Sequence, residues 1–162
     1  MTTEDIAQLI QDNVNVEVTV NTKQPQHEIL IKNTDIEKVC QFLKNNNQLM
    51  FDNLSCLTGI DNGPKANTME VVYNLYSITK SYRLTIKVML DREKPTLPSV
   101  VSVWNAANWH EREAYDLVGM TFENHPDLRR ILSPDDWEGH PLQKDYQEQE
   151  KYHGITVKYE RD

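Results

Sequence analysis

The sequence predicts an α+β fold in which a mixed, largely antiparallel sheet packs against helices and continues into an extended C-terminal tail. Segments with the two-residue alternation of strands and segments with the 3.6-residue period of amphipathic helices follow one another through residues 1–120. Periodicity then fades, and proline and glycine recur through residues 121–162. We therefore expect an α+β domain over residues 1–120 and an extended segment over residues 121–162.

The first predicted elements are a helix and two strands. Thr2 and Asp5 have the spacing of a capping box, which places a helix over residues 2–12. Residues 14–20 alternate valine with polar residues, as a strand with one buried face does. Residues 27–32 are predicted to form a second, short strand.

A second helix and three further strands follow. Thr34 and Glu37 again have the capping-box spacing and predict a helix with an apolar stripe. Strands are predicted over residues 51–60, 69–75 and 82–90, and their short connections favour antiparallel pairing. One face of the first of these strands is expected to carry Leu54, Cys56, Thr58 and Ile60.

The last helix is predicted over residues 99–118, with a break near Asn105 and an end at Gly119. At 100° per residue, the apolar stripe of this helix includes the carboxylate of Glu111. The opposite, polar side carries Trp109, Arg112, Glu113 and Asp116. The pattern therefore places a carboxylate on the core face and an indole on the polar face.

The position of Glu111 requires a partner for its charge. A buried carboxylate without one is strongly destabilising or becomes protonated. Arg129 and Arg130 lie a short loop away, and a guanidinium pairs with a carboxylate through two parallel hydrogen bonds. We expect Glu111 to pair with one of these arginines and so to pin the start of the tail to the helix.

Two features predict contact with another protein. Trp109 lies among charged residues, which favours an interface, packing under the chain's own tail or, as the third interpretation, ordinary surface exposure. In residues 133–144, proline and glycine prevent regular structure, while Trp137 and Leu142 are apolar anchors. Such a segment is either bound along a groove of a partner or disordered.

Composition argues against several kinds of function. The net charge of −8 and the pI of about 5.1 disfavour nucleic acid or anionic lipid as the main partner. No apolar run approaches the roughly 18 residues of a membrane-spanning helix, and the acidic residues 1–13 predict no signal peptide. No glycine-rich phosphate loop is present. Cys40 and Cys56 are too few for an iron–sulfur cluster, so we expect buried, reduced thiols.

The histidines give only a weak indication of catalysis. His110 and Glu111 begin like the zinc motif HExxH, but Ala114 stands at the second histidine position. Capping of carbonyls or turns is the more common role for histidines beside prolines. The alternative, a metal site assembled from distant segments, would use His125, His140, His153, Glu111 and Asp116.

Residues 104–146 fill nearly every position of a known family signature. The matching residues are ERE at 111–113, YDL at 115–117, Gly119, Phe122, HP at 125–126, LRRIL at 128–132, Trp137, GHPL at 139–142 and KDY at 144–146. This pattern resembles the 30 kDa subunit family of NADH-quinone oxidoreductase (respiratory complex I), whose bacterial members are called the C subunit. Gln143 departs from the arginine expected there, which weakens one possible contact of the tail.

The resemblance implies a peripheral-arm subunit that binds no redox cofactor itself, with FMN and iron–sulfur clusters in partner subunits. It implies docking chiefly on the D subunit, which carries the quinone site, and also on the B and I subunits, with residues 121–162 packing over these partners. The complex transfers electrons from NADH to quinone and translocates protons. The chain would thus be part of an enzyme, without its own active site, on the cytoplasmic side of the bacterial inner membrane.

Structural and interface roles, rather than catalytic ones, are therefore expected for Trp109, Glu111, Arg112, Glu113, Asp116, His125, Arg129, Arg130, Trp137 and His140. One alternative is the equivalent subunit of a ferredoxin- or cofactor F420-dependent dehydrogenase or of a membrane-bound hydrogenase. A free-standing metal-dependent enzyme is the more distant alternative.

Overall fold

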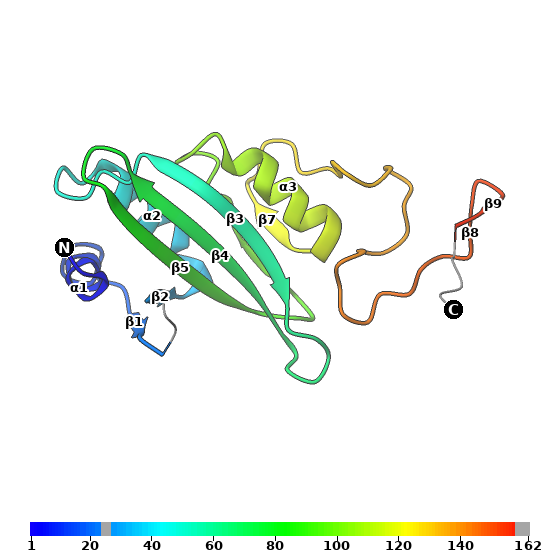
Figure 1. The fold of residues 1–162 in the computed structure, drawn as a ribbon, viewed down its shortest axis with the longest axis horizontal. Coiled ribbons are helices and arrows are strands. Elements are labelled where there is room, and N and C mark those ends of the chain that lie inside the picture. The colour runs from blue at the N-terminus through cyan, green and yellow to red at the C-terminus, as the bar shows by residue number, and fades with distance from the viewer. Residues whose placement is uncertain (24–26, 158–162) are drawn as a thin grey trace.

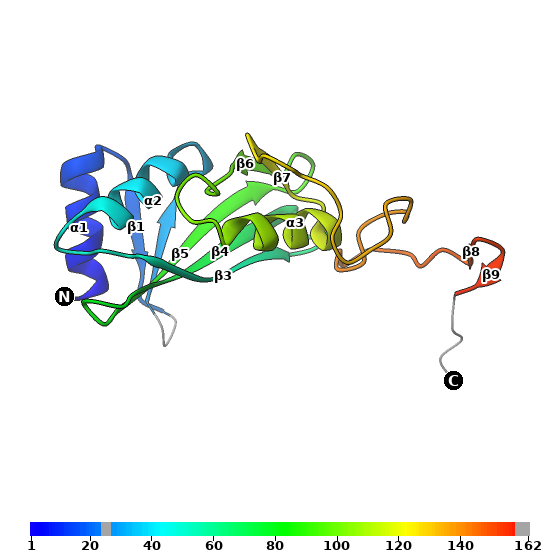
Figure 2. The same cartoon turned by 90° about the horizontal axis from the view of Figure 1, so that it is seen from above.

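The computed structural model describes residues 1–23 and 27–157 of the chain. A five-stranded sheet forms its centre, with α2 (Ile36–Asn45) and α3 (Ala107–Val118) on one side (Figures 1 and 2). The first helix, α1 (Thr3–Val14), packs beside the first strand and α2. The described helices and strands thus confirm the predicted α+β class.

The central sheet is mixed and largely antiparallel, as predicted. Its spatial order is β1-β2-β5-β4-β3, and only the β2–β5 pair is parallel. The bounds of its strands are β1 (Val18–Asn21), β2 (Glu28–Ile31), β3 (Asn53–Asp61), β4 (Thr68–Ser77) and β5 (Tyr82–Asp91). The smaller pairs are β6 (Thr96–Pro98) with β7 (Thr121–Glu123) and β8 (Lys151–Tyr152) with β9 (Ile155–Thr156).

The core follows the predicted alternation in β4 and β5. Every second residue of these strands faces the helices and is buried, while the opposite face carries polar groups such as Lys87 between Glu28 and Glu70. The buried side chains are Met69, Val71, Tyr73, Leu75, Leu84, Ile86, Val88 and Leu90. This apolar layer holds the sheet against α2 and α3.

The predicted inner face of β3 is confirmed at Leu54 and was wrong after it. A β-bulge between Leu54 and Cys56 adds one residue to this strand and reverses the alternation after it. Leu57 and Asp61 are therefore buried, whereas Thr58 and Ile60 are exposed. The bulge brings the Asp61 carboxylate to the inner side of the sheet, where it binds the tail.

Of the three predicted helix starts, the first is confirmed and the other two differ in the structure. The capping box of Thr2 and Asp5 is confirmed by both reciprocal hydrogen bonds. The one predicted at Thr34 does not form, because residues 33–35 make a 3₁₀ turn and α2 begins without a side-chain cap. The last helix begins at Ala107 rather than at residue 99, since residues 99–106 form turns instead.

Beyond β7 the chain forms the tail, a name kept for residues 124–157. It passes the C-terminal end of α3 and then extends away from the domain to the β8–β9 hairpin (Figures 1 and 2). The extended C-terminal tail of the predicted fold is thereby confirmed, and residues 158–162 of the predicted segment lie outside the described residues. No helix within residues 1–23 and 27–157 has the length and apolar character needed to span a bilayer.

Candidate functional site

Three charged side chains of α3 are buried, and two of them, Arg112 and Asp116, bind the tail. Glu111 and Asp116 are fully buried and Arg112 is 6% exposed. The burial of Glu111 confirms its predicted position on the core face. Arg112 and Asp116, which lie on the polar side of the helix, are buried because the tail covers that side.

Asp116 collects the start of the tail around one carboxylate. Its Oδ2 accepts hydrogen bonds from the backbone N–H groups of Ile131 (3.0 Å), Leu132 (2.8 Å) and Ser133 (2.8 Å). Its Oδ1 accepts one from Arg130 Nη1 at 2.7 Å. Burial alone raises the pKa of Asp116, but the Ser133, Arg130 and other hydrogen bonds outweigh burial and lower it to about 2.

Two arginines satisfy backbone carbonyls of the tail that have no ladder partner. Arg112 donates from Nε to the carbonyl of Arg129 (3.1 Å) and from Nη2 to that of Arg130 (3.0 Å). Arg130 in turn donates from Nη2 to the carbonyls of Trp137 (2.8 Å) and Gly139 (2.9 Å). Together with Asp116, these two side chains form what we call the first anchor of the tail.

The predicted pairing of Glu111 with Arg129 or Arg130 was wrong. Glu111 accepts hydrogen bonds from Ser99 Oγ (2.6 Å) and from the backbone N–H of Val100 (2.7 Å). The Glu111 carboxylate faces the turn before the helix, while the guanidinium of Arg130 binds Asp116 on another side of α3. The side chain of Arg129 pairs only with that of Asp127 in the described chain and stays exposed.

No cation of the described chain neutralises Glu111. The Nε2 atom of His125 is 3.9 Å from Glu111 Oε2, but the imidazole ring is neutral. Its Nδ1 accepts a hydrogen bond from the Asp127 N–H at 3.0 Å, so Nδ1 carries no proton. The proton is on Nε2, which donates to the Asn108 carbonyl at 3.3 Å. Burial lowers the pKa of His125. Burial raises the pKa of Glu111 to about 7, although the bonds from Ser99 and Val100 favour the charged form.

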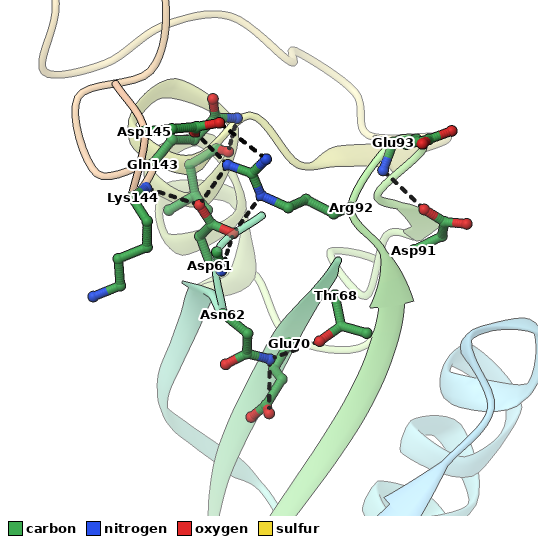
Figure 3. Close-up of polar contacts among 12 residues, drawn as sticks. Asp61, Asn62, Thr68, Glu70, Asp91, Arg92, Glu93, Gln143, Lys144 and Asp145 are labelled. Carbon is green, nitrogen blue, oxygen red and sulfur yellow. Dashed lines mark hydrogen bonds and ion pairs between the residues drawn. The ribbon is translucent and has the colours of Figure 1, made fainter. Parts of the chain in front are cut away.

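A second anchor holds the tail at the end of the sheet (Figure 3). The Asp61 carboxylate accepts bonds from Arg92 Nε (2.8 Å) and Nη2 (2.9 Å), from Gly63 N (2.9 Å) and from Lys144 N (2.8 Å). Arg92 also pairs with Asp145 of the tail. The Arg92 guanidinium and the backbone donors hold the pKa of Asp61 at about 2.

Sequence reasoning missed this second anchor. Asp61 opens the turn sequence DNGP at residues 61–64, and Arg92 follows the last predicted strand, so local pattern predicts a turn and a loop residue rather than a pair. The bulge in β3 decides that Asp61 points inward, and no local pattern reveals that bulge. The available signal was limited to Leu57, Gly59 and Asp61, which alternate on the side opposite to the predicted inner face and end in an acidic residue that requires a cation when buried.

The tail also caps the C-terminal end of α3. His140 Nδ1 lies 2.9 Å from the Asp116 carbonyl, and Gln143 Nε2 donates to the Val118 carbonyl at 2.9 Å. Gly119 has φ +86°, and a Cβ there would approach His140 Cδ2 to 2.7 Å. The interpretation of the histidines as carbonyl caps is confirmed for His140 and His125, and Gln143 makes a tail contact of its own.

Two of the predicted interface residues, Trp109 and Glu113, are exposed on α3. Trp109 is 63% exposed, so its predicted alternative of packing under the tail is wrong; the Arg112 guanidinium lies over its ring, 5.5 Å from the centroid. Glu113 is exposed, and no hydrogen bond or ion pair of its carboxylate occurs among the described residues.

Within the tail, Trp137 Nε1 donates to the Tyr146 hydroxyl at 3.1 Å, and its ring packs against Tyr152. Asp136 pairs with His153 at 2.9 Å. In the described parts of the chain, no three His, Cys, Asp or Glu side chains are grouped as metal ligands are. His125, His140 and His153 instead bind separate partners.

Comparisons with known proteins agree on one family. The family model described as "Respiratory-chain NADH dehydrogenase, 30 Kd subunit" matches residues 29–152. The NADH-quinone oxidoreductase C subunit of Chloroherpeton thalassium is 48% identical over 80% of this chain and 54% of its own length. The corresponding protein of Chlorobium phaeobacteroides, of the same name, is 49% identical over 75% of this chain and 73% of its own.

Solved structures share the fold. The trypsin-resistant fragment of Nqo5 has a TM-score of 0.60 and 25% identity, covering 78% of this chain and all of the fragment. A chain of the membrane-bound sulfane sulfur reductase, an archaeal respiratory membrane complex, has a TM-score of 0.73 over 89% of this chain and 85% of its own. At 23% identity, the second likeness concerns the fold alone.

Removal of the Asp116 carboxylate is expected to release the start of the tail. Asp116→Ala leaves three backbone N–H groups and Arg130 without their shared acceptor, so the free energy of unfolding should fall by roughly 3 kcal/mol. Urea denaturation measures this loss, and Glu123→Gln, an exposed change on β7, is the matched control. Equal stability of Asp116→Ala and wild type would contradict the role of this anchor.

Arg92→Gln is expected to loosen the tail at the second anchor only. The Asp61 carboxylate and Asp145 both lose their cation, so trypsin should cleave at Lys144 about tenfold faster, as the open form becomes more populated. Arg83→Gln, on the outer face of β5, removes an exposed arginine and should leave the cleavage rate unchanged. Identical rates for both variants would show that Arg92 does not hold the tail.

Glu111 is expected to make stability fall as the pH rises. Its pKa is about 7 when folded and 4.5 in the reference state, so the folded chain binds more protons between these values. The free energy of unfolding should decrease by on the order of 3 kcal/mol across this window. The difference between wild-type and Glu111→Gln curves isolates this contribution, and parallel curves from pH 4 to 8 would refute it.

Proposed function

Because the chain belongs to the respiratory-chain NADH dehydrogenase 30 kDa subunit family, we propose that it is a peripheral-arm subunit of a proton-translocating NADH:quinone oxidoreductase. Its relatives are named as subunits of that enzyme, so other subunits of a respiratory complex are its partners. Its proposed role in the complex is that of a scaffold, which holds the quinone-site and cluster-bearing subunits in their relative positions. The partners we propose are chiefly the D subunit and also the B and I subunits.

The observation that carries this proposal is the arrangement of the tail. Both anchors fix its first part to the domain, up to Asp145, while the part that follows extends away from the domain (Figure 1). Large apolar side chains are uncovered on both parts of the tail: Leu132 is 64% and Leu142 58% exposed on the anchored part, and Ile155 is 69% exposed on the projecting part. A segment that is bound to the domain at its start, extends away from it and carries exposed apolar residues is suited to packing on partner subunits.

The buried carboxyl groups favour a structural role over a catalytic one. Asp61, Glu111 and Asp116 are each at most 3% exposed and bind backbone N–H groups, a hydroxyl or an arginine of the chain itself. At that burial, none of these three carboxyl groups is open to a substrate in the described structure. We propose that the active site of the enzyme lies in other subunits.

We also propose that the chain carries no redox cofactor and that FMN and iron–sulfur clusters belong to partner subunits. Cys40 is fully buried, and burial raises the pKa of its thiol, which therefore stays protonated. Cluster ligation requires thiolates, in general four of them, and the chain has two cysteines. The proposed location is the cytoplasmic side of the bacterial inner membrane, held there by partner subunits.

A second candidate is the equivalent subunit of a related membrane-bound complex, such as a ferredoxin- or F420-dependent dehydrogenase or a hydrogenase. The fold shared with a chain of the sulfane sulfur reductase complex favours keeping this candidate. The identity of the co-purifying subunits separates the two, because a flavin-containing NADH-oxidising module belongs only to the first.

Recovery of the tagged chain from gently solubilised membranes tests the proposal. We expect the B, D and I subunits, flavin and iron to co-elute, while the chain purified alone is colourless and free of metal. Recovery as a single chain with stoichiometric metal would overturn the scaffold role.

A truncated chain tests the contribution of the tail. A variant ending at Tyr146 keeps both anchors and should fold with an unchanged melting temperature, because the hydrogen bonds of residues 147–157 in the described structure join only residues of the tail. Its recovery with the complex should fall about tenfold, as expected when roughly 1.4 kcal/mol of binding is lost. Recovery equal to that of the full-length chain would remove the tail from the proposed interface.

A further inference from the structure

The outer edge of β3 is an edge of the central sheet. No described strand pairs with this edge, although β3 (Asn53–Asp61) is nine residues long. Edge strands of natural proteins are usually protected by lysine, proline or a short length, because unpaired backbone groups bind other strands. The sequence of β3, NLSCLTGID, contains neither lysine nor proline, and its bulge lies at the end near Leu54.

A shallow groove runs between this edge and α3. Its floor is small and apolar: a Cβ on Gly59 would lie 3.2 Å from Ala114 Cβ. The lining is completed by side chains of three different segments. These residues are Leu57 and Thr58 of β3, Glu113, Leu117 and Val118 of α3, and Leu142 of the tail.

The carboxylate of Glu113 lines this groove and has no charged partner in the described chain. Glu113 is exposed, and its carboxylate forms no ion pair with a cation of the described chain. Leu142, on the same groove, is 58% exposed although its backbone N–H is bound to the Leu117 carbonyl at 2.8 Å. An occupant that fits therefore has an apolar side chain to cover Leu142 and a cation for Glu113.

We propose that this groove binds an extended, basic segment of another subunit, which adds to the edge of β3 and places an arginine or lysine opposite Glu113. Backbone pairing with β3 supplies affinity, and the ion pair selects the partner and its register. The inference rests on the proposed function, because it assumes assembly with other subunits, and it names the chemistry of one contact.

The chain's own segments fit the groove less well. A second copy pairing through β3 would bring no cation, since residues 53–61 include no lysine or arginine. The tail lines the groove only through Leu142; at the next residues its hydrogen bonds turn to Val118 and Asp61. A basic segment from a different polypeptide is the occupant that satisfies both the strand edge and Glu113.

Site-specific photocrosslinking in the assembled complex tests the inference. Benzoylphenylalanine at Thr58 should link to a different subunit, within about three residues of an arginine or lysine in an extended segment. The same probe at Ile78, which is 63% exposed in the β4–β5 turn, is the control and should give no such link. A link to a second copy or to the tail, or no link in the assembled complex, would refute the inference.

Charge reversal provides the second measurement. Glu113→Lys should lower recovery of the complex about tenfold, and Glu113→Gln should lower it less. Changing the crosslinked basic residue of the partner to glutamate should restore recovery of the complex by the Glu113→Lys chain. Both variants should melt as wild type does, since Glu113 has no partner within the described chain. Full recovery of Glu113→Lys would contradict the ion pair.

The two proposals fail in different ways. If the wild-type chain recovers no complex at all, the proposed function fails. If the wild-type chain recovers the complex but Thr58 gives no link to a basic segment, the function stands and the β3 contact is wrong.

Discussion

Asp116 has to remain ionised inside the protein, and most of the tail's path follows from that requirement. A buried carboxylate is tolerated only when donors surround it. Here the donors are three consecutive backbone N–H groups of the tail and the guanidinium of Arg130. The need is mutual, because this part of the tail has no strand or helix partner for its own backbone groups. Helix and tail are thus stabilised by the same contacts.

The Asp61–Arg92 pair contains a second buried carboxylate, which is satisfied by a guanidinium and by a backbone N–H group of the tail. It joins the sheet to residues 144 and 145 of the tail, while the stretch between the anchors caps the last carbonyls of α3. Gly119 permits this arrangement, since a side chain there would meet His140. After Asp145 no comparable contact with the domain occurs in the described chain. The tail is therefore bound to the domain up to Asp145, and the hydrogen bonds of the described residues after it stay within the tail.

The sequence predicted the parts of the structure that depend on local period. The alternation in β4 and β5 and the core position of Glu111 follow from patterns of two and 3.6 residues. The inner face of β3 did not, because one inserted residue reverses every later side chain. The partners of Glu111, Arg112 and Asp61 could not be predicted either. These partners lie 11 to 83 residues away in the sequence. The local sequence pattern around a charged residue does not indicate which distant residue it will bind.

Glu111 and Asp116 show how one helix holds two carboxylates in opposite ways. Both are fully buried, yet burial decides the pKa of Glu111, while hydrogen bonds decide that of Asp116. Glu111 has two donors and no cation, whereas Asp116 has four donors, one of them charged. The hydrogen bonds between Asp116 and the tail are therefore kept at neutral pH, far above the pKa of this carboxyl group. The charge of Glu111, whose carboxylate binds the turn at Ser99, changes near neutrality, so this pH effect acts on the contact between α3 and that turn and not on the Asp116 anchor.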